Sequence, residues 1–233
     1  MKRKAWQIIT LIFPLLFCIY MLLLRKYNFY VYERVGLEDN ILEWTQFFLY
    51  FLSGIFSVLL AFKYKGDRIL LLIYILFSAI FFFIAFEEIS WGERGLGNLS
   101  SVIVPTDLME RNLQGESNFH NIDSIHSKIG YIYSGIGVLG CFSWLGVHLL
   151  GKYMGIRDEF KKILKHLVPQ WYLFFYFFPL FINFLSIERF GFMPQDYELT
   201  ETCLALGIFL FVIGNYVGKG VDDNGFEPST PTM

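Results

Sequence analysis

The chain has 233 residues, of which 55% are hydrophobic and 20% aromatic, and its formal net charge is −2. With a mean hydropathy of +0.48, it is far too apolar for a soluble domain of this length, so the composition indicates an integral membrane protein. The chain has no basic excess to neutralise phosphates, which excludes nucleic-acid binding driven by bulk electrostatics.

Six apolar stretches follow one another along the chain, each near the length of about 20 residues that crosses a bilayer as a helix. They cover residues 5–24, 42–62, 69–86, 129–150, 168–187 and 199–217. Because lipid offers no partners to backbone polar groups, we expect all six to be α-helices. The predicted fold is an all-α integral membrane domain over residues 1–220, a six-transmembrane-helix bundle with a long extracytoplasmic loop between spans three and four.

The ends of two spans carry further signals. The first stretch follows the charged start MKRK and has no small-residue cleavage site, so we expect an uncleaved span rather than a signal peptide. In the fifth stretch, Pro169 suits a helix start, and Pro179 is predicted to kink the helix.

The distribution of charge predicts the orientation. With the N-terminus inside, twelve of the nineteen Lys and Arg residues fall on the inner side, so both termini are predicted to be cytoplasmic. Fifteen of the twenty-one Asp and Glu residues then fall on the outer side, many of them at span ends. The outer face is therefore where we expect chemistry.

Two adjacent carboxylates, Glu87 and Glu88, end the third span, where the helix dipole disfavours negative charge. An ionisable group near the headgroup region indicates a functional site by default. The alternative is a salt bridge to Arg94 or Arg111, or plain solvation. We keep both interpretations open at this stage.

The outer loop from Glu87 to Lys128 has about forty residues, longer than ordinary connections, and so predicts a functional or partly structured segment. Residues 105–115 are predicted to form a short surface helix. His120 and His126 lie beyond it; beside unpaired carboxylates they are suited to a Zn, Mn or Fe site or to general acid–base chemistry. A lone loop histidine is, however, more often an ordinary surface residue.

Three acids lie at the starts of spans, namely Glu43, Glu198 and Glu201. The helix dipole alone favours a carboxylate there by about 0.3–1 kcal/mol, which is the structural alternative for each. Glu198 and Glu201 share one helix face, which makes them the better pair for a ligand role.

The remaining features carry less weight. Cys18, Cys141 and Cys203 lie within apolar segments without metal-ligand spacing, and we interpret them as small core residues. Residues 221–233 are predicted to be a disordered tail. Their sequence resembles peptides from a reading frame that runs into a stable-RNA gene, so a non-native C-terminus is an open alternative.

Two motifs carry a family resemblance. The segments EEISWGERGLG (Glu87–Gly97) and NLQGESNFHN (Asn112–Asn121) resemble the paired signature of a family of bacterial polytopic membrane proteins of uncharacterised activity. Glu93 stands where that family has Gln. The resemblance implies a multi-pass protein of the bacterial inner membrane and no defined reaction.

Our functional hypothesis is a metal-dependent hydrolase or transferase acting on a lipid or lipid-linked substrate. Glu87, Glu88 and His120 would be catalytic. A divalent metal would be held by Glu88, His120, His126 and Glu201, while Arg94 or Arg111 binds an anionic headgroup. The alternative is a transporter or an accessory or scaffold subunit, with the bilayer as its partner. Span midplanes nearly free of charge argue against transport.

Overall fold

A computed structural model of the chain describes the backbone of residues 2–36, 41–92, 123–153, 155, 157–186 and 194–218. The side chains of residues 2–4, 123–130, 183–186 and 194 fall outside this description. Regular structure in the described ranges is helical throughout, with no strand. The predicted surface helix at 105–115 and the predicted tail at 221–233 lie outside the described residues.

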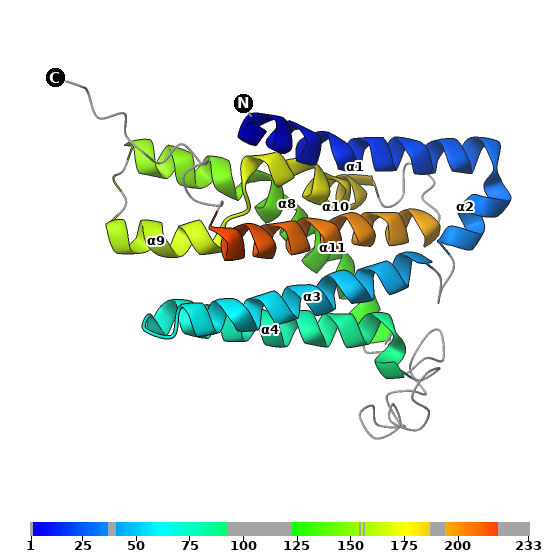
Figure 1. The fold of residues 1–233 in the computed structure, drawn as a ribbon. Helices are drawn as coiled ribbons and strands as arrows, with labels where there is room; N and C mark the ends of the chain where they lie inside the picture. Colours follow the sequence, from blue (N-terminus) through cyan, green and yellow to red (C-terminus); the bar gives the residue numbers. More distant parts are fainter. Residues whose placement is uncertain are drawn as a thin grey trace.

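The chain forms a bundle of long helices joined by shorter ones (Figure 1). In chain order these are α1 (Lys2–Tyr27), α2 (Phe29–Val35), α3 (Ile41–Lys63), α4 (Arg68–Glu88), the 3-10 turn η1 (Ser90–Gly92), α8 (Asp123–Tyr153), α9 (Asp158–Leu167), η2 (Trp171–Leu173), α10 (Phe174–Ser186) and α11 (Pro194–Val217).

Five of these helices are long and apolar enough to cross a membrane. The spanning segments are Ala5–Tyr27, Ile41–Lys63, Arg68–Glu88, Tyr131–Tyr153 and Gln195–Val217. Their outer surfaces carry large exposed apolar side chains; on α1, for example, Ile9 and Leu16 are 62% and 59% exposed. The protein is therefore a multi-pass membrane protein whose described regular structure is helical, and five of the six predicted spans coincide with these five helices.

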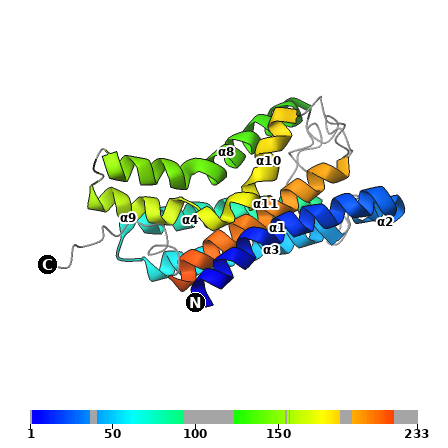
Figure 2. The same ribbon diagram turned by 90° about the horizontal axis from the view of Figure 1, so that it is seen from above.

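The sixth predicted span, residues 168–187, is not confirmed as one helix. Val168 has extended backbone angles, as expected for a residue before proline, and Pro169 and Gln170 are not helical. The helix α10 begins only at Phe174, so Pro169 is not its first residue. The 13 residues of α10 cover about 20 Å, less than the hydrocarbon thickness of about 30 Å. After α9 ends at Leu167, the residues of this predicted span are instead divided between η2 and α10. Figure 2 shows α9 and α10 as two separate helices.

The bundle has two polar ends. We call the end where α3 begins at Ile41, α4 ends at Glu88 and α11 begins at Pro194 the carboxylate end. The opposite end, where α3 ends at Lys63 and α4 begins at Arg68, is the lysine end.

An aromatic core holds the helices together between the two ends. Its fully buried side chains include Tyr74, Tyr176 and Leu180, from α4 and α10. At the lysine end, Asp67 caps α4 by accepting hydrogen bonds from the backbone nitrogens of Ile69 and Leu70. This cap fixes the tight α3–α4 hairpin, whose other end carries Glu88.

The outermost helix, α1, is anchored by charge at the carboxylate end. Asp196 of α11 is 6% exposed and accepts hydrogen bonds from Arg25 Nη1 at 2.7 Å and from the Tyr32 hydroxyl at 2.5 Å. Burial, together with the Asp196 carboxylate, raises the pKa of Tyr32 above its usual value. This triad joins α1, α2 and the start of α11.

Candidate functional site

Carboxylates from three helices converge at the carboxylate end. Glu43 lies in the first turn of α3, and Glu88 is the last residue of α4. Because α11 begins at Pro194, Glu198 and Glu201 are its fifth and eighth residues, so Glu201 lies beyond the first turn and not at the helix start as predicted. Glu88 is close enough to Glu201, Glu198 and Glu43 to be repelled by all three. We call these four residues the carboxylate cluster. It unites two predicted site residues, Glu88 and Glu201, that are 113 positions apart in the chain.

Two tyrosines line the carboxylate cluster. Tyr133 of α8 is hydrogen-bonded to Glu201, and Tyr133 also lies within electrostatic range of Glu88. Tyr50 of α3 is 2% exposed and lies within range of the same two carboxylates. The candidate site therefore combines the carboxylate cluster with two phenolic groups, and its residues come from four helices in all.

Gln46 connects α3 to the α11 side of the cluster. Its side chain is fully buried, and its Nε2 donates to Glu198 Oε2 and to Thr202 Oγ1, each at 3.1 Å. Its Oε1 is buried and has no hydrogen-bond partner among the described residues. A buried amide oxygen beside carboxylates is a ready acceptor for a cation or a donor group.

Glu87 and Glu88 have different surroundings although they are adjacent. Glu87 is 6% exposed and accepts a hydrogen bond from Trp91 Nε1. Ser90 and Trp91 have positive φ angles of 47° and 54°, which turn the chain back so that the indole stacks on Phe86. The structure thus ties Glu87 to the turn that ends α4, whereas Glu88 faces the cluster.

Several predicted site residues lie outside the described residues. These are His120, Arg94 and Arg111, together with the side chain of His126, whose backbone belongs to α8. Among the residues that the structure describes, no group of three or more His, Cys, Asp or Glu is arranged to hold a metal ion. The predicted metal set of Glu88, His120, His126 and Glu201 therefore stays a prediction.

The electrostatics of the carboxylate cluster define what it can do. Within the described part of the chain, no ion pair joins Glu88 or Glu201 to a basic side chain. At short range and away from bulk water, like charges repel strongly, and the repulsion is relieved when a proton or a cation binds. The arrangement therefore suits proton exchange with a substrate or the binding of a cationic group.

A second buried polar group lies at the lysine end. The Tyr74 hydroxyl lies 2.7 Å from His166 Nδ1, and Asn215 Nδ2 donates to the His166 carbonyl at 3.3 Å. Burial is the main cause that lowers the pKa of His166 to about 4; Lys162, Lys63 and Lys165 add to it and Asp67 opposes it.

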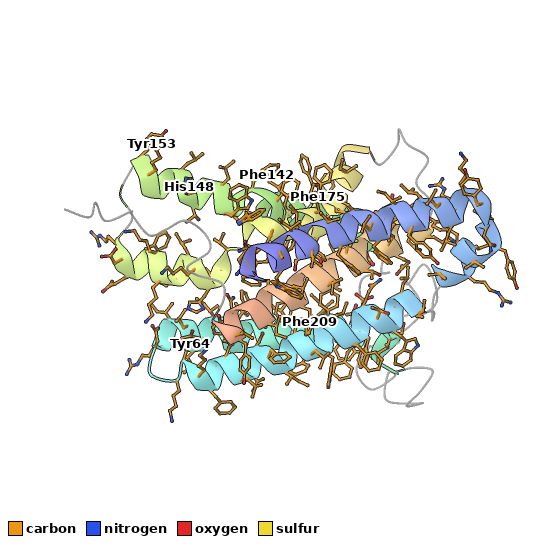
Figure 3. The ribbon with its side chains drawn as sticks, turned by 45° about the horizontal axis from the view of Figure 1, so that its top comes forward. Tyr64, Phe142, His148, Tyr153, Phe175 and Phe209 are labelled. Atoms are coloured by element: carbon orange, nitrogen blue, oxygen red, sulfur yellow. The ribbon has the colours of Figure 1, made fainter. Side chains whose placement is uncertain are left out.

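Tyr64 also lies at the lysine end, just after α3, and its ring packs on His166 (Figure 3). His148 and Tyr153 lie on α8 (Figure 3). The neutral His166 thus belongs to a separate group, far along the bundle from the carboxylates.

The sequence interpretation missed Gln46, Tyr50 and Tyr133 as site residues. A signal existed for two of them, because Glu43, Gln46 and Tyr50 are spaced to share one face of a helix. Tyr133 had no such signal, since only the packing of α8 brings its hydroxyl to Glu201.

Comparison of the chain with family models, with curated proteins and with solved structures found no match.

Proposed function

We propose that the protein is a membrane-embedded hydrolase or transferase whose substrate is a lipid or a lipid-linked molecule. The observation that carries this proposal is that Glu201 is hydrogen-bonded to Tyr133 while Glu88, from a different spanning helix, lies within electrostatic range of both residues. Glu88 would act as general base toward the attacking water or hydroxyl. Glu201 and Tyr133 would return the proton to the leaving group.

The position of the site supports a lipid substrate. α3 begins, α4 ends and α11 begins within one level of the bundle, and apolar spanning segments continue below it. A lipid in the surrounding bilayer would present its headgroup linkage at this level, with its chains along the apolar helix faces. Glu88 is partly exposed, so a substrate can reach it.

The metal, the loop residues and the orientation belong to the proposal as well. His120 and His126 would complete a divalent metal site with Glu88 and Glu201, and such a metal would supply Lewis-acid activation of water. Arg94 or Arg111 would bind an anionic headgroup. The excess of Lys and Arg at the lysine end supports a cytoplasmic location for that end, which would put the carboxylate cluster at the outer face of the bacterial inner membrane.

The experiment is a lipid turnover assay in proteoliposomes made from a total bacterial lipid extract, followed by mass spectrometry. Wild type should consume one lipid class, and Glu88→Gln should lower the rate about 100-fold or more. Tyr133→Phe should lower it less, and Glu33→Gln on the exposed face of α2 should leave it unchanged. Equal rates for wild type and Glu88→Gln would contradict the catalytic role.

A second candidate is a cation-binding transporter or accessory subunit without chemistry of its own. The buried Oε1 of Gln46, which has no hydrogen-bond partner in the described part of the chain, favours it, because an amide oxygen beside carboxylates is a typical donor set for hard cations. Thermal stabilisation by Mg²⁺, Ca²⁺ or Mn²⁺ that is lost in Gln46→Leu, with no lipid turnover, would select this candidate.

A further inference from the structure

Two cysteine thiols from opposite ends of the chain meet between α1 and α11. The Sγ atoms of Cys18 and Cys203 lie 3.9 Å apart, although the residues are separated by 185 positions. Both cysteines are free, as is Cys141 of α8. Cys141 contacts a backbone carbonyl, that of Phe174, at 3.6 Å, and so serves as an internal reference for an isolated thiol.

The surroundings of this thiol pair are apolar. Cys203 is 2% exposed, and Cys18 is partly buried beside Phe17 and Met21. Both residues lie well inside their spanning segments, about 13 Å from the carboxylate end at a rise of about 1.5 Å per residue. Charged thiols dissolved in water have no ready access to this depth. A small oxidant that dissolves in the bilayer does.

The geometry allows a covalent bond with little movement. A disulfide needs an S–S distance of about 2.05 Å, so the two sulfurs must approach by about 2 Å. Rotation of the Cys18 side chain and a small shift of α1 can supply this. The outermost position of α1, with large exposed side chains such as Ile9 and Leu16, makes such a shift less costly than movement of a core helix.

We propose that Cys18 and Cys203 form a redox modification site, which closes to a disulfide when dioxygen or a similar lipid-soluble oxidant reaches it. Two S–H bonds break and one S–S bond forms. The two electrons and two protons pass to dioxygen, which is reduced to hydrogen peroxide. A dithiol reductant reopens the bond by thiol–disulfide exchange and becomes the disulfide itself.

The bond would tie the peripheral helix α1 to the helix that carries the carboxylate cluster. Cys203 follows Glu201 by two residues and Thr202, a partner of Gln46, by one. The disulfide would therefore restrain α11 within one turn of the site. The proposal itself depends only on the thiol pair and not on the function of the carboxylates.

The test counts free thiols. Membranes containing the protein are oxidised in air with copper–phenanthroline, and the remaining thiols are labelled in detergent with a polymer-linked maleimide and counted by gel shift. Wild type, with three cysteines, should fall from three labels to one, and dithiothreitol should restore all three. In Cys141→Ser, the number of maleimide labels per chain should fall from two to none on oxidation. In Cys18→Ser and in Cys203→Ser, two labels should remain after oxidation.

The outcomes separate clearly. Three labels on oxidised wild type, or equal losses in wild type and Cys18→Ser, would overturn the proposal. A band at twice the monomer mass without reductant would assign the loss to bonding between two molecules and would also overturn it. Cys18→Ala and Cys203→Ala repeat the test if a serine variant fails to fold. In Cys141→Ser, oxidation should raise the thermal unfolding temperature, and Cys18→Ala should lack this shift.

Discussion

At the residue scale, the two carboxylates that end α4 show how one helix register produces two roles. Adjacent helical residues point about 100° apart, so Glu87 and Glu88 cannot face the same neighbours. Glu87 accepts a hydrogen bond from the indole of Trp91, while Glu88 meets carboxylates from α3 and α11. The first arrangement stabilises the helix end, and the second works against stability unless a ligand or proton compensates.

Exchanging each of these two carboxylates for an amide should therefore change stability in opposite directions. At a pH high enough to ionise Glu88, Glu88→Gln should raise the free energy of unfolding by about 1 kcal/mol, because it removes repulsion from Glu201, Glu198, Glu43 and Glu87. Glu87→Gln should lower it, because the indole then meets a neutral acceptor. Thermal unfolding in detergent measures both. A destabilised Glu88→Gln would instead indicate that Glu88 is held by a basic partner.

His166 predicts a pH dependence of stability. Its pKa of about 4 lies below the 6.5 of an ordinary histidine, so the unfolded chain binds the proton more readily. The contribution of His166 is complete above about pH 6.5 and is lost as the pH falls toward 4, by at most about 3 kcal/mol. His166→Gln should flatten the acid limb of unfolding temperature against pH, whereas the exposed His148→Gln should not. Equal acid limbs in all three proteins would contradict this.

The residues of the site were predictable to different degrees. Glu88 stands out in the sequence because the helix dipole disfavours a carboxylate at the end of a span. Glu201 stands out because it shares a helix face with Glu198. Gln46 and Tyr133 do not, because an amide and a phenol inside a span are equally typical of helix packing. Only the packing of α3 and α8 against α11 places them beside carboxylates.

At the element scale, the predicted fifth span, residues 168–187, is where the structure differs most from the sequence-based prediction. The apolar run from 168 to 187 predicted one helix, yet Pro169 ends α9, and the chain turns through η2 before α10 begins. Hydropathy measures the preference for lipid and not the continuity of a helix. The break is also polar, since both amide atoms of Gln170 are buried without a hydrogen-bond partner among the described residues.

Close packing between α8 and α10 predicts a position-specific effect of glycine substitution. A Cβ added at Gly137 would lie 2.7 Å from the Phe181 backbone nitrogen, whereas one added at Gly135 would meet nothing within 4 Å. Gly137→Ala should therefore destabilise the protein by about 1–3 kcal/mol through overpacking. Gly135→Ala should be neutral or slightly stabilising because alanine favours the helix. Equal unfolding temperatures for the two variants would show that α8 and α10 do not approach this closely.

At the scale of the whole molecule, composition and charge predicted the class of protein, and five spanning helices confirm it. The packing partners of those helices were not predictable, because each is apolar on most of its surface and lipid does not distinguish one face from another. Small residues such as Gly137 and buried polar residues such as Gln46 select the faces, and both are scattered through the chain.

The divided fifth predicted span leads to a prediction about topology. If α9, η2 and α10 together cross the bilayer, the chain crosses an even number of times and both termini lie on the lysine-rich, cytoplasmic side. Green fluorescent protein fused to either terminus should then fluoresce, and alkaline phosphatase fused to either should be inactive. An active phosphatase at the C-terminus would mean that α10 does not complete the crossing.

The claim on which this account depends most is that Glu88 of α4 and Glu201 of α11 belong to one site. A double-mutant cycle tests it directly, using the unfolding free energies of wild type, Glu88→Gln, Glu201→Gln and the double variant at a pH high enough to ionise both carboxylates. The account predicts that each single substitution relieves the same repulsion, so that the double variant gains less than the sum, with a coupling of about 0.5–3 kcal/mol. Strict additivity of the two substitutions would contradict a shared site.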